Sequence, residues 1–380
     1  MAARIPTTHV GSLPRPPDLL AEVTAREQGV SIDEDAFAAR LRNAVNEVVA
    51  RQVAVGIDII DDGEFGKPSF VSYVNERLTG FELDPEPPRE SRWAHSREFN
   101  EFPEFYAATH SAARLNHMIC TAPIRYGGMA RLQIDIENLK AALTGLKPHA
   151  VFMPAISPAS AADWQRNAYY RTDEEYLFAI ADALREEYEA IVKAGFLLQV
   201  DDPHLVTFWI KSPDLTVQQW RKWAELRVEA LNHALRNIPP ERVRHHTCYG
   251  INMGPRVHDL ELKHMIDLIV RIRAGAYSFE AANPRHEHEW KVWKSVKLPP
   301  GKSLIPGVIS HSTVLVEHPE LVAERIVRFA GVVGRENVIA GADCGFATFA
   351  GSKEVHPSIV WAKLKSLVEG AKLASKELWA

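Results

Sequence analysis

Short apolar runs alternate with long amphipathic stretches along most of this chain. The short runs are rich in β-branched residues, and most of them end in polar or acidic residues. They predict strands at residues 7–12, 56–64, 150–157, 196–202, 243–250, 276–282, 304–310 and 337–345. Between most of these runs the apolar positions recur at helical spacing. The pattern therefore predicts repeated βα units, which build a parallel sheet.

Two of the predicted helices have recognisable ends. We expect one to begin at a capping box formed by Ser31 and Glu34 and to end at Gly56. The other covers 172–195 and begins at a similar box with Thr172 as its N-cap residue. A glycine after the last turn is typical of a helix that leads into a buried strand.

The fold predicted from eight strands with helical crossovers is a TIM (β/α)8 barrel, in which residues 1–380 form a single α/β domain. An open, doubly wound sheet is the rival architecture. Its first strand is usually followed by a glycine-rich turn that binds phosphate. Here the first strand is followed by LPRP, which turns into proline instead. We therefore favour the barrel.

The stretch 81–135 departs from the βα pattern. Its first half is rich in proline, charged residues and aromatic residues. Because it follows the second predicted strand, it should lie at the C-terminal mouth of the barrel. We interpret it as an insertion between strands 2 and 3 that covers the substrate, in preference to a disordered surface loop.

Composition narrows the function classes. Hydrophobic residues make up 46% of the 380 residues and charged residues 24%, as in a globular protein, and the net charge is −5 with basic residues scattered. This distribution gives no indication of a nucleic-acid partner. No apolar run is long enough to span a membrane, and the start of the chain lacks the pattern of a signal peptide. Three cysteines are too few for a disulfide framework, so we expect a cytoplasmic protein with free thiols.

Polar side chains gather where the predicted strands end, which is where barrel enzymes carry their catalytic groups. Seven of the eight strands contribute to this set. Its members are Ser12, Asp61, Asp62, Glu64, Asp201, Asp202, His246, Cys248, Glu280, His311, Asp343 and Cys344.

His246 and Cys248 are the most informative pair. They lie two positions apart on a predicted strand, so their side chains leave the same face. With Cys344 and Glu280 at the ends of nearby strands, they form a set of N, S and O donors that suits Zn²⁺ better than Mg²⁺ or Ca²⁺. The ordinary alternative is a core histidine beside a buried cysteine that acts as a small apolar residue.

At this point the sequence resembles a known family. The catalytic barrel of cobalamin-independent methionine synthase, whose superfamily includes the epoxyalkane:coenzyme M transferases, carries similar motifs in the same order over residues 7–375. The matching motifs here are HVGSLP, DGEFGKPSF, QVDDP, HTCYG, YSFEAANP and GADCGF.

The resemblance implies a role for each motif residue. It places zinc ligands at His246, Cys248, Glu280 and Cys344, a substrate-binding serine at Ser12, and acidic groups for the substrate ammonium at Glu64 and Asp201. It also places a proton donor at His311. The family's tryptophan after strand 3 is not clearly kept, although Trp164 is near.

The function that the resemblance implies is zinc-dependent alkyl transfer to a thiol. Its leading form is methyl transfer to homocysteine through a zinc-bound thiolate. The donor stays open between 5-methyltetrahydrofolate, a corrinoid protein and other small molecules. Addition of coenzyme M to an epoxide is the alternative. Two alternatives belong to other classes of function, namely hydrolysis by zinc-activated water and a purely structural zinc. The oligomeric state is left open.

The acidic pair bears on this choice. Two buried acids repel each other unless a cation lies between them, which favours an ammonium ligand for Glu64 and Asp201. Alternatively, these acids pair with Arg15 or Arg125, and the same arginines would suit the sulfonate of coenzyme M.

Two further features lie outside the predicted zinc set. His286 and His288 follow the sixth strand, where a solvated loop is the simplest reading, although a second metal is the alternative. Cys120 lies in the insertion and is expected to be only a loop thiol near the mouth.

Overall fold

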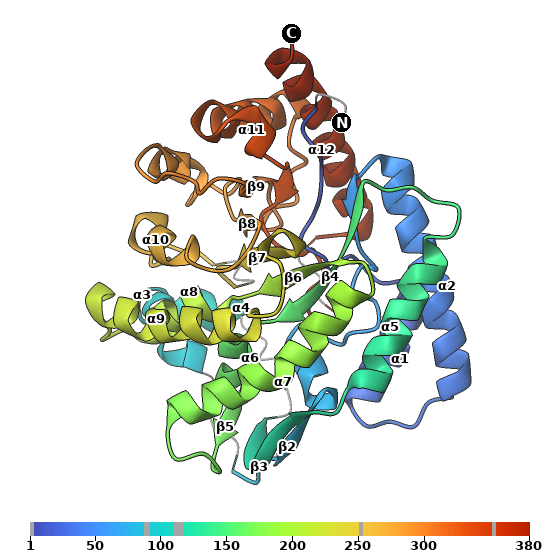
Figure 1. The fold of residues 1–380 in the computed structure, drawn as a ribbon, viewed down its shortest axis with the longest axis vertical. Helices are drawn as coiled ribbons and strands as arrows, with labels where there is room; N and C mark the ends of the chain where they lie inside the picture. Colours follow the sequence, from blue (N-terminus) through green and yellow to red (C-terminus); the bar gives the residue numbers. More distant parts are fainter. Residues whose placement is uncertain (1–3, 87–91, 110–116, 251–253, 352–354) are drawn as a thin grey trace.

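The structure is a computed structural model that describes residues 4–86, 92–109, 117–250, 254–351 and 355–380. Its centre is a parallel sheet curled into a barrel (Figure 1). The neighbouring strands, in order, are β1 (Ile59–Ile60), β4 (Ala150–Ile156), β6 (Leu197–Asp201), β7 (Val243–Thr247), β8 (Ala276–Phe279), β9 (Ser303–Ile309) and β10 (Gly341–Ala342). Each strand pairs in parallel with the next.

The eighth predicted strand, at 7–12, is present as two isolated bridges. Thr7 pairs with Ala340 and Thr8 with Ile59, both in parallel, so the two edges of the curled sheet are joined. The backbone N–H of Thr8 donates to the Ala340 carbonyl at 2.9 Å, and that of Ile59 donates to the Thr7 carbonyl at 3.0 Å. The predicted barrel is therefore confirmed, with a first strand shorter than expected.

Helices surround the barrel (Figure 1). In chain order the longer ones are α1 (Pro17–Glu27), α2 (Glu34–Val55), α5 (Met129–Ala142), α7 (Asp173–Lys193), α9 (Val217–Ala234), α11 (Pro319–Val333) and α12 (Pro357–Leu378), and the shorter α6 (Pro158–Asp163), α8 (His204–Lys211) and α10 (Ile266–Ile269) lie between them. In α7, Leu177, Ile180, Leu184 and Ile191 recur at helical spacing and are fully or almost fully buried. This stripe packs the helix against the sheet, which fixes the ends of the strands in place.

The start of α2 differs from the prediction. Its N-cap residue is Asp33, whose side chain accepts hydrogen bonds from the N–H groups of Asp35 and Ala36. The capping box expected at Ser31 is wrong, because the nearer carboxylate already accepts from these free N–H groups. The expected end at Gly56 is confirmed.

The segment between β1 and α5 leaves the barrel. It contains β2 (Leu78–Leu83), which pairs antiparallel with β3 (Met118–Tyr126), and β3 pairs in parallel with β5 (Gln165–Asn167). Between β2 and β3 lie the short helices η2 (Arg92–His95), α3 (Arg97–Glu101) and α4 (Pro103–Thr109). The range 81–135 therefore starts inside β2, and its last seven residues belong to α5. Its function as a cover stays a prediction.

Contacts from α3 reach the loops at the mouth of the barrel. The Arg97 guanidinium donates to the backbone carbonyls of Trp209 at 3.0 Å and of Leu215 at 2.6 Å. The buried Glu98 carboxylate accepts from the N–H of Arg256 at 3.0 Å and of His258 at 2.8 Å. The Arg97 bonds attach the segment to α8 and the turn after it, and the Glu98 bonds attach it to the loop after β7.

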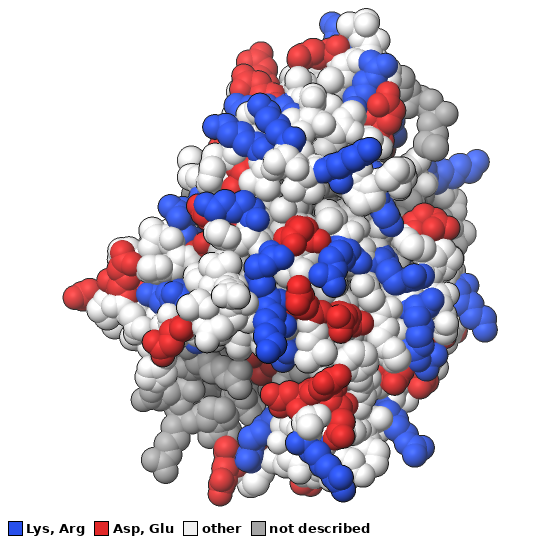
Figure 2. Space-filling model, turned by 60° about the vertical axis from the view of Figure 1, so that its left-hand side comes forward, with Lys and Arg blue, Asp and Glu red and all other residues white. Residues whose placement is uncertain are grey.

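Figure 2 shows acidic and basic side chains interspersed over the face that it presents. Charged side chains on the outer helices form ion pairs, such as Arg221 with Asp267 and Arg328 with Glu324. Among the described residues, no helix is both long and apolar enough to cross a bilayer.

Candidate metal and thiol-binding site

Three predicted ligands lie together at the C-terminal end of the barrel. His246 is on β7, Cys248 follows that strand, and Cys344 follows β10. Their ligand atoms all lie within 4.8 Å of one another, and the Sγ atoms of Cys248 and Cys344 are 3.3 Å apart. All three side chains are buried.

The donor set fits a zinc ion. Both ring nitrogens of His246 are buried without a hydrogen-bond partner, which a core histidine avoids. The contact with the Cys248 thiol, together with burial, raises the pKa of Cys344 well above its ordinary value. A soft divalent cation would satisfy one nitrogen and remove the repulsion between two thiolates. We therefore retain these three residues as candidate ligands.

Glu280, the predicted fourth ligand, follows β8 and is held in a different cluster. Its Oε2 accepts hydrogen bonds from Arg256 Nη1 and Asn283 Nδ2, both at 2.7 Å. Its Oε1 accepts a longer bond of 3.3 Å from the N–H of Tyr249. Glu280, His311 and Asp343 have ligand atoms within 4.8 Å of one another. The role of Glu280 as a ligand stays a prediction.

Asp343 has a structural explanation. Its carboxylate accepts from the N–H groups of Ala281 at 2.7 Å, Ala282 at 2.8 Å and Asn283 at 3.0 Å. These bonds hold the chain that follows Glu280. Asp343 therefore links the ends of β8 and β10, which carry two of the candidate ligands.

His311, the predicted proton donor, follows β9. It is 2% exposed, and neither ring nitrogen has a hydrogen-bond partner. Burial, and then the nearby Arg256 charge, lower the pKa of His311 to about 4. The imidazole is therefore neutral at pH 7, with a free N–H and a free acceptor nitrogen. Its role in catalysis stays a prediction.

Ser12 lies beside the chain that follows Cys344. Its Oγ is 3.2 Å from Thr348 Oγ1 and 3.5 Å from the Ala347 N–H. A Cβ atom on Gly345 would collide with Ser12 Oγ, so the close approach requires glycine there. The hydroxyl therefore lies close to Gly345, the residue after Cys344. The substrate-binding role of Ser12 stays a prediction.

The acidic pair has a counter-ion within the chain. Lys67 Nζ lies 3.4 Å from Glu64 Oε2 and donates to the Pro154 carbonyl at 2.6 Å. Burial, and then the Glu64 charge, raise the pKa of Asp201 well above its ordinary value. The expected repulsion between Glu64 and Asp201 is therefore present, but Lys67 offsets part of it. The ammonium-binding role of both acids stays a prediction.

Neither arginine considered for this pair contacts its carboxylates. The Arg15 guanidinium donates to the backbone carbonyls of Glu64 at 2.6 Å and Ala347 at 3.0 Å. Arg125 is exposed on β3, opposite Thr79. Sequence reasoning missed Lys67, although it stands inside the quoted motif DGEFGKPSF.

The remaining acids of the strand ends divide into two kinds. Asp202 accepts from Ser157 Oγ at 2.7 Å and lies 3.5 Å from His245 Nε2, so it ties β6 to its neighbours. Asp61 is fully buried with an unpartnered Oδ2, and burial and the Asp62 charge raise the pKa of Asp61 well above its usual range. Of these two acids, Asp61 is the one with a buried carboxylate oxygen that has no hydrogen-bond partner.

The prediction of a solvated loop at His286 is wrong. Its Nδ1 lies 2.7 Å from Glu289 Oε2, and its Nε2 lies 3.0 Å from Asp259 Oδ2. These acids raise the pKa of His286 to about 9, against the effect of burial, which is the largest single influence. His288, in contrast, is exposed. The spacing of His286 and Glu289 on one turn was the available signal for this pair.

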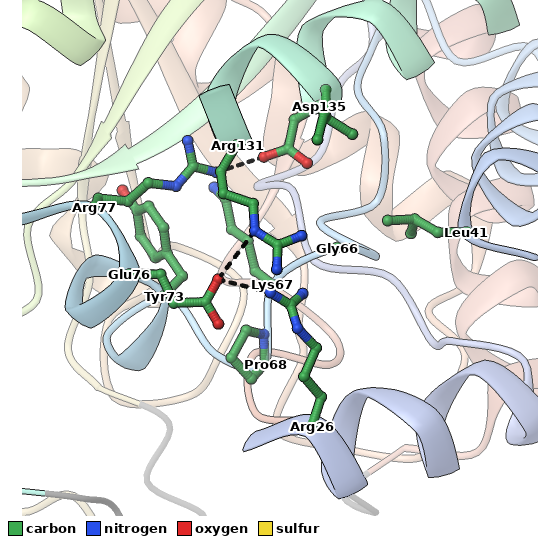
Figure 3. A pocket seen from close by; sticks show the side chains of 11 residues that line it. Arg26, Leu41, Gly66, Lys67, Pro68, Tyr73, Glu76, Arg77, Arg131 and Asp135 are labelled. Carbon is green, nitrogen blue, oxygen red and sulfur yellow. Dashed lines mark hydrogen bonds and ion pairs between the residues drawn. The ribbon is translucent and has the colours of Figure 1, made fainter. Parts of the chain in front are cut away.

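A hollow lies on the outer side of Lys67 (Figure 3). Arg26 and Arg131 both point toward Glu76, at 3.1 Å and 3.7 Å, and Arg77 pairs with Asp135 at 2.5 Å. Because these charges satisfy one another, the hollow has the features of a structural ion-pair network.

Two other predicted features keep modest roles. Cys120 is buried on β3, where its thiol contacts the Ala122 carbonyl at 3.3 Å, and it lies outside the cysteine pair. Trp164 is half-buried after α6. Neither joins the candidate ligands.

This chain is similar to a known family and to several known proteins. The family described as cobalamin-independent synthase, catalytic domain, matches residues 5–97 and 116–372. A methionine synthase of Thermococcus kodakarensis is 24% identical over 98% of this chain and 94% of its own length. One of Saccharolobus islandicus is 26% identical over 98% and 96%. The structure of a B12-independent methionine synthase from Shewanella sp. W3-18-1, in complex with selenomethionine, superposes with a TM-score of 0.75 at 18% identity over 99% of both chains.

Proposed function

The chain belongs to the family of cobalamin-independent synthase catalytic domains, which are methyltransferases, and we propose that it transfers a methyl group to homocysteine or a related thiol in a zinc-dependent reaction. One observation carries the metal part of the proposal. His246, Cys248 and Cys344 converge from two separate strands, and His246 has no other partner. A structural zinc usually takes its ligands in pairs from short loops, so ligands from separate strands at a barrel mouth favour a catalytic site.

Zn²⁺ would be held by His246, Cys248 and Cys344, with Glu280 as the fourth ligand. Bound there, the ion would lower the pKa of an incoming thiol and keep it nucleophilic at neutral pH. Two thiolate ligands donate charge to the ion and make it a weak activator of water, which disfavours hydrolysis.

The rest of the substrate is bound by residues of the chain. Glu64 and Asp201 would bind the α-ammonium group. The unpartnered Oδ2 of Asp61 lies near Glu64 Oε1, because both carboxylates approach Gly11. Ser12 would donate its hydroxyl to the substrate carboxylate. Together these contacts fix the thiol relative to the ligands, so that its sulfur approaches the methyl donor from one direction.

His311 would bind the atom from which the methyl group departs. Its free N–H can donate a hydrogen bond to that atom as charge develops on it, and its burial excludes water from the same position. The donor itself stays open between 5-methyltetrahydrofolate, a corrinoid protein and other small molecules.

The coenzyme M alternative is less well supported, because neither arginine that favoured it lies free at the site. A sulfonate needs a cation, but Arg15 is occupied by backbone carbonyls and Arg125 is exposed on β3. We therefore place amino-acid thiols first.

Zinc-edge X-ray absorption on the purified protein tests the proposal. We expect one zinc per chain with two sulfur ligands, and a third sulfur ligand after addition of homocysteine but not of coenzyme M. Cys248→Ser should lose zinc, whereas Cys120→Ser should retain it, because Cys120 is equally buried but lies outside the cluster. If the number of sulfur ligands on zinc does not change after addition of either thiol, the proposal is contradicted.

Methyl transfer is measured in parallel, with 5-methyltetrahydrofolate and with methylcobalamin as donors. Formation of methionine from either donor identifies the methyl source. Formation from neither, in a protein that gains the third sulfur ligand, would limit the function to thiol binding.

A further inference from the structure

Arg256 occupies an unusual position beside one candidate ligand. It lies in the loop after β7, is 4% exposed, and has a left-handed backbone conformation with φ of 59°. Its Nη1 donates to Glu280 Oε2 at 2.7 Å. Asn283 Nδ2 donates to the same oxygen at the same distance, and these are the two shortest hydrogen bonds to that carboxylate. The two oxygens of Glu280 therefore differ. Oε2 is held by two short bonds, whereas Oε1 receives only the 3.3 Å bond from the Tyr249 N–H.

The position of Arg256 is itself fixed by its neighbours. Its Nε donates to Asp259 Oδ2 at 2.8 Å, and that oxygen also lies 3.0 Å from His286 Nε2. The N–H of Arg256 donates to Glu98 Oε2 at 3.0 Å, which stabilises the left-handed backbone at that residue. An arginine held in this way cannot follow Glu280 if the carboxylate moves.

Arg256 and a metal ion would compete for the same carboxylate. Both are cations, and a buried carboxylate gains most from the cation that it contacts directly. The histidine and cysteine ligands have no such competitor in the described part of the chain, since both His246 nitrogens are unpartnered and the thiols contact each other. Of the four candidate ligands, Glu280 is thus the one that already has a second cationic partner, Arg256.

We propose that Arg256 is a positioning residue that draws Glu280 away from the metal and so makes Glu280 the ligand that gives way to the substrate thiol. This inference rests on the proposed zinc site. With Arg256 in place, the bond lost when the thiol displaces Glu280 is replaced by the short bond to Nη1. Without it, no guanidinium replaces the metal as the partner of Glu280 Oε2, and Glu280 is harder to displace.

A purely structural role is the competing explanation, because Arg256 also neutralises Asp259 and anchors the loop. Arg285 offers a matched control. Its Nε donates to the Arg256 carbonyl at 3.0 Å and its Nη2 to the Val257 carbonyl at 3.1 Å, so it holds the same loop without contacting Glu280. A loss of loop structure should appear in Arg285→Met as well.

The experiment uses the full chain loaded with Co²⁺, whose visible absorption reports the ligands, and titrates it with homocysteine. We expect Arg256→Met to bind Co²⁺ as tightly as the wild type, or more tightly, in competition with a chelator. The homocysteine concentration needed for half of the spectral change should rise by about tenfold, the typical effect of one charge-assisted hydrogen bond. Arg256→Lys, which keeps the charge, should recover part of this loss, and Arg285→Met should match the wild type.

The outcomes separate the two proposals. A wild type that binds no metal, or whose spectrum ignores homocysteine, contradicts the proposed function itself. If the wild type responds, and Arg256→Met and Arg256→Lys respond at the same homocysteine concentration as the wild type, the role of Arg256 is overturned but the proposed function is not. An equal loss in Arg285→Met also overturns it, in favour of loop structure. If Arg256→Met does not fold, the comparison of Arg256→Lys with Arg285→Met decides the question.

Discussion

Lys67 changes what the acidic pair at the barrel mouth can bind. With its Nζ 3.4 Å from Glu64, a substrate ammonium would share that carboxylate with a cation of the chain. The positive charge that the sequence led us to expect between the acids is thus supplied in part by the protein. Binding of an amino-acid thiol then depends on the charge that Glu64, Asp201 and Asp61 leave uncompensated.

Glu64→Gln should weaken binding of homocysteine specifically. The substitution removes one negative charge and leaves Lys67 without its carboxylate partner, so the ammonium meets a repelling cation. We expect kcat/KM for homocysteine to fall by at least about tenfold, in the range of a charged hydrogen bond. The value for 4-mercaptobutyrate, which lacks the ammonium, should stay within about twofold. Equal losses for both thiols would contradict the ammonium-binding role.

His9 should make stability depend on pH. Burial, the largest cause, lowers the pKa of His9 from 6.5 to about 4, and its Nδ1 accepts the Gly11 N–H at 3.2 Å, so the folded state holds it neutral. Between pH 6.5 and 4 the unfolded chain binds a proton at this residue that the folded chain does not. The free energy of unfolding therefore falls as the pH falls through this window, by about 3 kcal/mol in total.

A comparison with His9→Gln isolates this contribution. The variant keeps a polar side chain but has no group that titrates there. The stability advantage of the wild type over the variant, from denaturant unfolding at pH 7.5 and pH 4, should shrink by about that amount. An advantage that does not change with pH would show that folding leaves the pKa of His9 near its ordinary value.

At the scale of elements, β9 and β10 approach each other more closely than a side chain allows. Gly307 of β9 pairs with Gly341 of β10, and a Cβ atom on Gly307 would lie 2.6 Å from the Cα and N atoms of Asp343. Asp343 in turn holds the chain after Glu280. The packing of two strands thus sets the position of two candidate ligands.

Gly307→Ala should destabilise the fold and loosen the site. Overpacking of this kind typically costs 1–3 kcal/mol, so about 3 kcal/mol is expected here, where backbone atoms are hit. Gly331→Ala is the control. It lies within α11 with nothing within 4 Å of its added Cβ, and should stabilise by about 0.5–1 kcal/mol because alanine favours helix. Denaturant unfolding measures both, and equal effects would contradict the close approach.

The helices and strands show which parts of the fold and of the candidate site could be predicted from sequence patterns. The short apolar runs located the strands, because both faces of a parallel sheet in a barrel are buried. However, β1 and β10 have only two residues each. The candidate ligands could be located because they stand at strand ends and within motifs that resemble a known family. Arg256 and Lys67 could not, since loop backbones place them and no local pattern reports where a loop side chain points. Asp33 in place of Ser31 shows the same limit within one helix turn.

At the scale of the molecule, a metal that binds only the folded state must stabilise the whole chain. A metal at a free concentration of 100 times its Kd contributes about 2.7 kcal/mol. For 380 residues this corresponds to a change in Tm of about 3 °C. Addition of a chelator to the zinc-loaded protein should therefore lower Tm by at least that amount, measured by calorimetry.

Restoring zinc should reverse the change, and Cys248→Ser should show neither effect. A shift of equal size in Cys248→Ser would mean that the metal acts at some other place.

The bridges at Thr7 and Thr8 also determine when the protein can become active during its synthesis. Thr7 pairs with Ala340, and Ser12 lies beside Gly345, so the barrel closes only after residues 340–345 have been added. A ribosome-bound chain that has emerged as far as His246 and Cys248 has two of the candidate ligands and an open sheet edge. Ala340, which closes the barrel, and Cys344, the third candidate ligand, follow within a few residues of each other. If the proposed site holds a metal, loading is therefore a late event in synthesis, and a product that ends before Cys344 would be unable to retain the metal there.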